Sequence, residues 1–506
     1  MASKLMKIAP SKAAFISLRK SFERVPILGE ETVPNFNPSR FFRSLYGDAP
    51  NTFLFESGKG PQATARYTMM GQSNSRSLLA DHDQVIISDN GTREAKPGSP
   101  LSVLDHLNFE IHGAPFDYTP HFWGGWVGLI GYEMARHLDA IDLRPKDGLD
   151  IPLLHFVQVD RLWIFDHTTH VLKMIVSEKC PGNPEAHYET IRREIRNHWQ
   201  QAELYLKPST GPDYSVAQAS SNGNGCSLRS NLSKSQYIQM VERAKTYIEE
   251  GDIYQANLAQ RFETPFKGNS FDLYEHLRRV NPSPFSGYMK LGDLTLVSSS
   301  PERLVKVNQG VLETRPIAGT RPRGRDSKED DLLTHELLLN EKEKAEHLML
   351  VDLERNDLGR ICEYGSVRVT DQMFVEQYSH VSHIVSNIRG ILKPDIVLKD
   401  ILKAVFPGGT ITGCPKIRCM EIIDELEPVT RGPYSGSFGY IGFSDTLDLN
   451  IIIRTILIKE DKAYFHVGAG IVADSEPSRE HQETLNKAQG MLSALHLAHA
   501  WTDSHP

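Results

Sequence analysis

Two pairs of glutamates recur at the same spacing in the second half of the chain. Glu343 and Glu346 lie in EKAEHLMLVDLERND, and Glu480 and Glu483 lie in SREHQETLNK. Residues three apart share a helix face, so each pair would present two carboxylates together if both segments are helices. Mg²⁺ prefers oxygen ligands and is often held by one or two carboxylates plus oxygens of the substrate. The recurrence therefore favours a magnesium site, whereas either pair alone would indicate a solvated helix face.

Two segments that each contain several glycines could bind an anion. FPGGTITGCPK (406–416) places Thr410 among three glycines ahead of a predicted helix, and a helix start offers unpaired backbone N–H groups. It lacks the Lys-Ser/Thr pair of a nucleotide-binding phosphate loop, so ATP hydrolysis is not supported. HVGAGIV runs from a predicted strand into Gly468, Ala469 and Gly470. A plain tight turn is the alternative for the first segment taken alone, and a solvated charged face is the alternative for the helix that follows the second.

Several single residues have side chains suited to catalysis or binding. Glu302 follows a predicted strand and could be a buried general acid, or could simply pair with an arginine. Arg454 lies in the apolar segment NIIIRT, predicted to be a strand, where a buried guanidinium needs a partner such as a carboxylate ligand. His383 lies in a strand-like stretch, where a lone histidine is more often structural. Tyr434 and Gly319–Thr320 occupy turn-like positions with exposed polar groups.

Composition excludes several classes of protein. The net charge is −8 with 24% charged residues and no basic stripe, so nucleic acid is not an expected partner. No apolar run reaches the roughly 20 residues of a membrane span. The cysteines, at positions 180, 226, 362, 414 and 419, form no CxxC pair, which argues against a disulfide framework or a zinc site. The basic N-terminus faintly resembles a transit peptide, but its apolar positions favour a first helix, FISLRKSF, and we expect a cytoplasmic protein.

The order of predicted elements indicates an α+β fold. Strand-like runs and helices are mixed without regular β-α alternation, which predicts mainly antiparallel sheet. Helices are expected over 330–355, 399–405, 415–426 and 478–497, the last capped by Ser478. A strong amphipathic helix, KSQYIQMVERAKTYIEEGD, is expected to end at Gly251. The polar segment 220–233 predicts a linker between an N-terminal region, 1–219, and a C-terminal region, 234–497.

Taken together, these motifs resemble the chorismate-utilising enzymes. That family includes anthranilate synthase component I, aminodeoxychorismate synthase component I, isochorismate synthase and salicylate synthase. The matching blocks are GDIYQANLAQRF, SPERLVKV, RPIAGTRPRG, ELLLNEKEKAEHLMLVDLERNDLGR, YSHVSHIVSNIRG, FPGGTITGCPK, RGPYSGSFGYIG and GAGIVADSEPSRE, which run in this order over about 240–495. The resemblance implies two packed, mainly antiparallel sheets with helices outside.

The resemblance also implies a role for each candidate residue. Glu346 and Glu483 would hold Mg²⁺, with Glu343 and Glu480 supporting it through water, and the metal would bind the ring carboxylate of chorismate. Glu302 would help the C4 hydroxyl group leave. Substrate contacts would come from Gly319, Thr320, Tyr434, Arg454 and the backbone of Gly468, Ala469 and Gly470, while His383, Thr410 and Lys487 would line the site.

Two positions bear on which member of the family the chain resembles. Enzymes that add water to chorismate carry a lysine base where this chain has Gln255, and a neutral amide is no general base. Ammonia therefore fits better than water as the nucleophile. Some aminodeoxychorismate synthases have PIKGT, whose lysine attacks the ring, where this chain has PIAGT with Ala318. Other members have PIAGT, and FPGGTITG, DLNIIIRT and FWGGWVG also resemble aminodeoxychorismate synthases, whereas FISLRKSFERVPI resembles anthranilate synthase.

We therefore expect aminodeoxychorismate synthase component I, with anthranilate synthase component I as the alternative. The chain lacks the G-x-C-x-G-x-Q element of glutamine amidotransferases, so a separate glutaminase subunit would supply ammonia. FLFES and NPSPF resemble the elements of a tryptophan pocket in this family, which would comprise Glu56, Ser57, Pro284 and Phe285. A regulatory paralogue that binds an aromatic ligand without turnover is a third, more distant alternative.

Overall fold

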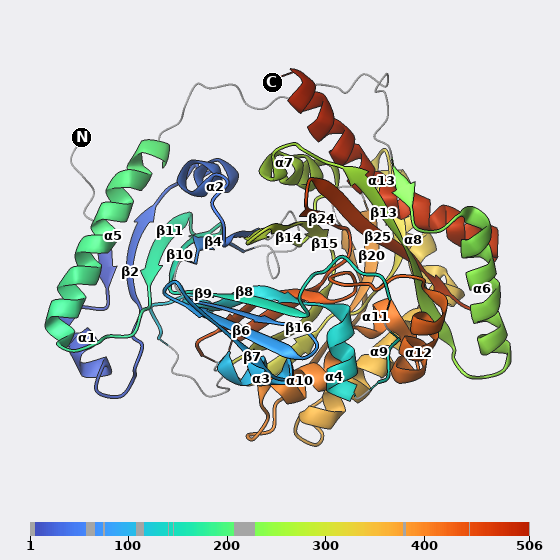
Figure 1. Cartoon of the computed structure of the whole chain (residues 1–506), viewed down its shortest axis with the longest axis horizontal. Coiled ribbons are helices and arrows are strands. Elements are labelled where there is room, and N and C mark those ends of the chain that lie inside the picture. Colours follow the sequence, from blue (N-terminus) through green and yellow to red (C-terminus); the bar gives the residue numbers. More distant parts are fainter. Residues whose placement is uncertain are drawn as a thin grey trace.

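The chain folds around two large antiparallel sheets with most helices outside them (Figure 1). The structure, a computed structural model, describes residues 6–56, 66–73, 76–107, 116–139, 141–144, 146–206, 228–377, 381–444 and 446–504. Every pair of named strands is antiparallel. Both sheets contribute to each of two large apolar clusters, and in one of these Phe55 contacts Phe438 with ring centroids 5.8 Å apart. This confirms the α+β fold with two packed, mainly antiparallel sheets.

The first sheet is assembled from both ends of the chain. In the order of pairing its strands are β1 (Lys7–Ala9), β2 (Ile27–Thr32), β11 (Val171–Val176), β10 (Arg161–Asp166), β4 (Tyr67–Gln72), β3 (Thr52–Glu56), β14 (Phe285–Leu291), β15 (Leu294–Ser300), β24 (Thr455–Lys459), β25 (Lys462–Ile471), β13 (Gln255–Pro265) and β12 (Arg229–Ser230), and the short β21 (Gly413–Cys414) pairs with β13. The β3–β14 pair joins the N-terminal half to the C-terminal half.

The second sheet is likewise shared between the two halves. Its strands, in order of pairing, are β18 (Ile317–Pro322), β20 (Val381–Ile391), β17 (Val311–Thr314), β16 (Arg303–Asn308), β23 (Thr446–Ile451), β22 (Ser437–Gly442), β8 (Gly125–Ile130), β9 (Leu154–Val159), β5 (Arg76–Ala80), β6 (Gln84–Asp89) and β7 (Thr92–Pro97), and β19 (Arg368–Gln377) pairs with β20. The proposed regions 1–219 and 234–497 therefore share both sheets, and the boundary between them stays a prediction. Residues 220–227 of the expected linker lie outside the described residues.

The helices are α1 (Lys12–Leu18), α2 (Pro38–Tyr46), α3 (Leu101–His106), α4 (Ala135–Asp139), α5 (Pro184–Leu206), α6 (Lys234–Glu249), α7 (Ser270–Val280), α8 (Ser327–Leu339), α9 (Glu341–Ile361), α10 (Leu398–Val405), α11 (Gly409–Thr412), α12 (Lys416–Leu426) and α13 (Pro477–Ser504), with a 3₁₀ turn η1 (Tyr132–Met134). In Figure 1, α5 lies along the outer side of β2 and β11, and α13 lies along β25 and α7. None of these helices, as far as the described residues extend, is long and apolar enough to cross a membrane.

Helix boundaries show where the sequence predictions were right and wrong. Helix α6 begins after Ser233, which forms a capping box with Gln236. It ends at Glu249, close to the expected end at Gly251. The single helix expected over 330–355 is instead two, α8 and α9, because Asn340 ends the first and caps the second. The expected Ser478 cap is wrong: α13 begins at Pro477, and the Ser478 hydroxyl donates to Glu476 instead.

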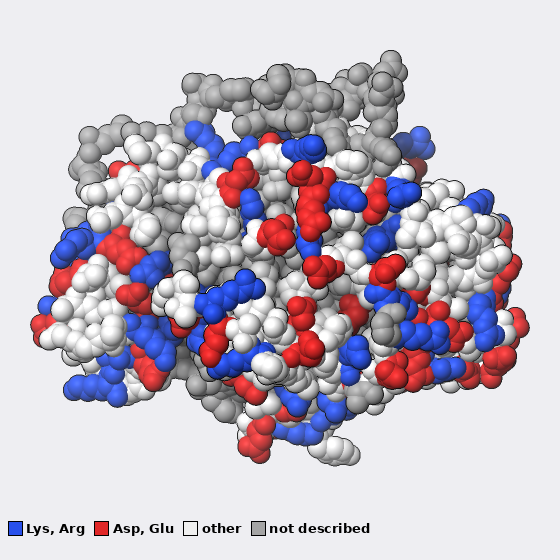
Figure 2. Space-filling view, in the orientation of Figure 1, with Lys and Arg blue, Asp and Glu red and all other residues white. Residues whose placement is uncertain are grey.

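Surface charge and cysteines agree with the composition. Figure 2 shows Lys and Arg interspersed with Asp and Glu over the face viewed, without a broad basic area there. Four of the five cysteines lie within the described residues, and all four are free thiols.

Candidate active site

A cavity of about 430 Å³ gathers most of the candidate residues from distant parts of the chain. Its walls come from β13 and β25 of the first sheet, from β18 and β20 of the second, and from helices α9 and α13. The candidates that line it are Glu302, Gly319, Glu343, Glu346, His383, Thr410, Tyr434, Arg454, Gly468, Gly470, Glu480, Glu483 and Lys487. A cavity of this size suits a small organic ligand.

Both glutamate pairs line this cavity, one from α9 and the other from α13. Asn340 caps α9 by accepting a hydrogen bond from Glu343 N at 3.1 Å, which fixes the first turn that carries Glu343. Glu343 Oε1 accepts from Arg321 at 2.7 Å, while its Oε2 is buried without a hydrogen-bond partner among the described residues. On α13, Glu483 pairs with Lys487 at 2.7 Å.

These carboxylates fit a magnesium ion that is completed by other oxygens. No three acidic, His or Cys side chains within the described residues already form a ligand cluster. Mg²⁺ does not require one, since it keeps several waters and commonly takes one or two carboxylates plus substrate oxygens. The orphaned, buried Oε2 of Glu343 is an oxygen that still needs a cation or a donor.

Glu302 has the properties of a buried proton donor. It lies just after β15, and 7% of its surface is exposed. Burial raises the pKa of its carboxyl to about 7, although the hydroxyl of Thr410, the charge of Arg454 and the N–H of Ile317 all act to lower that pKa. A carboxyl group with this pKa is substantially protonated near neutral pH and can donate a proton.

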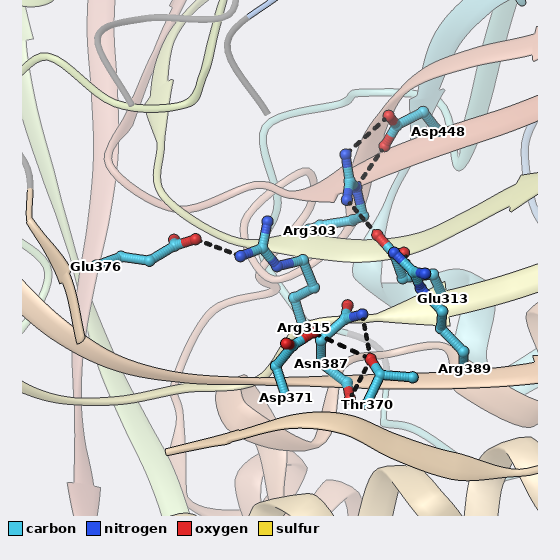
Figure 3. Close-up of polar contacts among 9 residues, drawn as sticks. All are labelled: Arg303, Glu313, Arg315, Thr370, Asp371, Glu376, Asn387, Arg389 and Asp448. Carbon is cyan, nitrogen blue, oxygen red and sulfur yellow. Dashed lines mark hydrogen bonds and ion pairs between the residues drawn. The ribbon is translucent and has the colours of Figure 1, made fainter. Parts of the chain in front are cut away.

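The strand that begins immediately after Glu302 is fixed by a buried ion-pair network (Figure 3). Arg303 makes two hydrogen bonds to Asp448, at 2.9 and 3.2 Å, and a third to Glu313 at 3.0 Å. Glu313 also accepts from Arg389 at 2.7 Å. Because Arg303 binds on one side of β16, Glu302 is held facing the cavity on the other side.

Arg454 lies beside Glu302, but not in the strand that the sequence predicted. It lies between β23 and β24 in the left-handed region, at φ +49°. Its guanidinium makes no hydrogen bond or ion pair with any of the described residues, and its charge opposes the burial that raises the pKa of Glu302. An unpaired guanidinium at a cavity wall is suited to an anionic ligand such as a carboxylate.

Gly319 and His383 form the part of the wall nearest α9. His383 Nδ1 donates to the Gly319 carbonyl oxygen at 3.2 Å, and burial lowers the pKa of His383 to about 4, so the ring is neutral at physiological pH. Gly319 has φ +63°, and a Cβ there would lie 2.3 Å from Glu343 Oε2. The left-handed backbone conformation therefore favours glycine, whereas the carboxylate of Glu343, at the end of a flexible side chain, can shift. Thr320 pairs with His383 across β18 and β20, and its side chain is not described.

The glycine segment of β25 leaves room above the sheet. Gly468 and Gly470 face the cavity, whereas the Ala469 side chain is buried in the apolar core on the opposite face. Any contact from Ala469 to a ligand would therefore come from its backbone. Lys487 Nζ donates to the Gly468 carbonyl oxygen at 3.1 Å, which connects α13 to this strand.

The structure also brings in residues that the sequence did not single out. His466 lines the cavity and stacks on Tyr434 with ring centroids 5.0 Å apart and ring planes at 12°, and Asn257 lines it from β13. A signal for His466 was present, because it lies at period two before Gly468 and Gly470, which places all three on one strand face.

A second cavity, of about 290 Å³, lies between the two sheets. It is lined by Glu56, Pro284 and Phe285, three of the residues predicted to form a tryptophan pocket, together with Arg303 and Asp448. Glu56 accepts hydrogen bonds from Tyr274 at 2.7 Å and from Arg278 at 2.6 Å. Ser57 lies outside the described residues.

Comparison with known proteins assigns the family. The sequence model of the chorismate-binding enzymes matches residues 50–493. The chain belongs to the chorismate-binding enzyme family. A chorismate-binding enzyme named anthranilate synthase component 1, from Acetivibrio thermocellus, is 40% identical over 490 residues, 95% of this chain and 97% of that protein.

Two further chorismate-binding enzymes are similar over most of their length. Aminodeoxychorismate synthase component 1 of Bacillus subtilis is 38% identical over 463 residues, which is 90% of this chain and 94% of that protein. The crystal structure of anthranilate synthase component I from Streptococcus pneumoniae TIGR4 matches with a TM-score of 0.71 and 34% identity, covering 85% of this chain and 92% of that one. The present chain is thus a chorismate-utilising enzyme.

Proposed function

We propose that the chain is aminodeoxychorismate synthase component I, which replaces the C4 hydroxyl group of chorismate with ammonia to give 4-amino-4-deoxychorismate. The observation that carries amination is Gln255, which lines the cavity where water-adding members of the family have a lysine base. A neutral amide cannot remove a proton from water, whereas ammonia is nucleophilic without activation. The reaction balances as chorismate plus ammonia giving 4-amino-4-deoxychorismate plus water.

Different side chains of the cavity would bind the substrate and transfer the proton. Arg454 would bind a substrate carboxylate, because its guanidinium has no partner among the described residues. Glu302 would donate its proton to the C4 oxygen as the C–O bond breaks, so that hydroxide leaves as water. Tyr434 and the backbone at Gly468 and Gly470 would hold the enolpyruvyl group against β25.

Magnesium would be held by Glu346 and Glu483, with Glu343 and Glu480 supporting it through water. When bound, Mg²⁺ would neutralise the ring carboxylate of chorismate and so favour departure of the C4 oxygen. Alanine at Glu346 or Glu483 should abolish Mg²⁺-dependent turnover, and the metal assignment would be wrong if either variant kept it.

Ala318 bears on the chemical route within this function. It lines the cavity where some aminodeoxychorismate synthases carry the lysine that attacks the ring. A methyl group cannot form a covalent adduct, so ammonia itself would form the bond to C4. A separate glutaminase subunit would supply that ammonia, in agreement with the name component 1 of the relatives.

Anthranilate synthase component I is the second candidate. It is favoured by the Acetivibrio thermocellus protein of that name, which is 40% identical over nearly its whole length, and by the Streptococcus pneumoniae structure. That reaction would place nitrogen at C2, release pyruvate and give anthranilate, with the same cavity and the same glutamates.

Product analysis separates the two candidates. Purified chain would be incubated with chorismate, Mg²⁺ and ammonium at alkaline pH, and half of each sample would also receive an aminodeoxychorismate lyase. We expect 4-aminobenzoate only where the lyase is present. Anthranilate and pyruvate formed without the lyase would overturn the proposal in favour of the second candidate.

A further inference from the structure

One wall of the catalytic cavity carries hydrogen-bonding atoms that have no partner among the described residues. They are Gln255 Oε1, Asn257 Oδ1 and both ring nitrogens of His466. Asn257 is 7% exposed and His466 is 4% exposed, so bulk solvent does not satisfy them. Buried polar atoms are nearly always hydrogen-bonded in folded proteins, so a group of orphans at one cavity wall indicates a missing ligand.

These side chains converge because β13 and β25 present them on one face of the first sheet. Asn257 pairs with Gly470 across the two strands, and the pairing continues to Arg261 opposite His466. A Cβ on Gly468 would lie 2.4 Å from Asn257 Oδ1 and 2.8 Å from the Tyr434 hydroxyl, and a Cβ on Gly470 would lie 2.5 Å from the Gln255 amide nitrogen. The glycines therefore keep open the space that the orphaned atoms face.

The chemistry of this wall selects a neutral ligand that donates hydrogen bonds. The amide carbonyl oxygens of Asn257 and Gln255 accept hydrogen bonds and would repel a carboxylate, so the carboxylate of the enolpyruvyl group would lie toward Arg454 and away from this wall. The His466 ring is neutral, because burial and the charges of Arg261 and Arg431 hold its pKa well below the usual value. Arg261 disfavours a cation beside His466, whereas the charge of Arg431 is neutralised by its ion pair with Glu427. Ammonia is neutral, small and carries three N–H donors, whereas ammonium would be opposed by Arg261.

We propose that Asn257, Gln255 and His466 form a binding subsite that holds ammonia beside the substrate before it attacks the ring. The subsite rests on the proposed amination, and it gives Gln255 a positive role: its carbonyl oxygen positions the nucleophile. Two acceptors on β13 would orient the ammonia N–H groups toward the sheet, which leaves the nitrogen lone pair directed into the cavity.

Steady-state kinetics with ammonium as the varied substrate test this subsite. At one pH and saturating chorismate, we expect Asn257→Ala and His466→Phe each to raise the KM for ammonium at least about tenfold, with the KM for chorismate changed less than about twofold. Phenylalanine keeps the stacking on Tyr434 while removing both ring nitrogens. Asn257→Ser, a smaller change, serves if the alanine variant does not fold.

Thr264→Val is the matched control. Thr264 lies on the same strand as Asn257, and its buried hydroxyl also lacks a hydrogen-bond partner among the described residues, but it does not line the cavity. Its KM for ammonium should equal that of the wild type. Unchanged ammonium KM in the Asn257 and His466 variants, with losses confined to kcat or the KM for chorismate, would overturn the subsite alone. A wild-type chain that turns over no chorismate with ammonium would overturn the proposed function as well.

Discussion

At the scale of single residues, the protonation of Glu302 can be tested directly through the pH dependence of catalysis. Its burial places the pKa of the carboxyl near 7, and its protonated form is the proposed proton donor. We expect kcat/KM for chorismate to fall about tenfold per pH unit above about pH 7, when un-ionised ammonia is held constant. Glu302→Gln should lower kcat by about 10²–10⁴-fold and remove this alkaline limb.

The same pKa predicts how Glu302 affects stability. The folded-state pKa is raised from 4.5 to about 7, so the stability associated with this group is complete below about pH 4.5 and is lost as the pH rises through about 7. The loss is on the order of 3 kcal/mol, and Glu302→Gln should therefore be more stable than the wild type at pH 8 and similar to it at low pH. Chemical denaturation at both pH values measures this. Glu203→Gln, on an exposed part of α5 and without an ion pair among the described residues, is the control and should show no such difference.

Residue types were the most predictable part of the site. The repeated E-x-x-E spacing indicated which side chains could supply oxygen ligands, and the glycine segments indicated where the backbone is accessible to a ligand. The cavity gathers nearly all of these residues. The orphaned atoms of Asn257 and His466 could not be predicted, because hydrogen-bond satisfaction depends on neighbours brought in by strand pairing. The sequence placed Arg454 in a strand because NIIIRT is apolar. In the structure Arg454 has a positive φ, and strand β23 ends before it, at Ile451.

At the scale of elements, the break between α8 and α9 sets the position of two proposed metal ligands. Asn340 donates its backbone N–H to Glu336 at the end of α8 and accepts from Glu343 N at the start of α9. Sequence periodicity continues through this point, which is why one helix was predicted. The spacing of hydrophobic residues does not reveal a helix cap when polar residues lie on both sides of that cap.

Removing this cap should loosen the metal site more than the substrate site. Asn340→Ala should lower the free energy of unfolding by about 1 kcal/mol and raise the Mg²⁺ concentration needed for half-maximal activity severalfold. Equilibrium unfolding and Mg²⁺ titrations of activity measure the two effects. Asn340→Ser, which retains a capping oxygen, should recover most of the stability. An Asn340→Ala protein with normal Mg²⁺ dependence would show that the cap does not position Glu343 and Glu346.

At the scale of the whole molecule, the fold class could be predicted but the partners of each strand could not. Mixed strands and helices without β-α alternation indicated an antiparallel α+β protein, as found. The polar segment 220–233 suggested two regions, yet β3 pairs with β14 and β8 pairs with β22, so each sheet crosses that boundary. Such long-range pairing is decided by the packing of complete sheets, which local sequence patterns do not contain.

The shared sheets place the second cavity next to the catalytic strand, and this yields the last prediction. Arg303 lines the second cavity, while its neighbour Glu302 faces the catalytic one. We propose that an aromatic amino acid such as tryptophan binds between Phe285 and Glu56, where it would contact strands of both sheets. A ligand at 100 times its Kd should stabilise the fold by about 2.7 kcal/mol, which thermal unfolding detects as a rise in Tm of a few degrees. Phe285→Ala should abolish this rise without altering the Tm shift caused by chorismate and Mg²⁺. If millimolar tryptophan leaves the Tm of the wild type unchanged, the cavity is not a tryptophan site, and its position between the sheets would then serve packing alone.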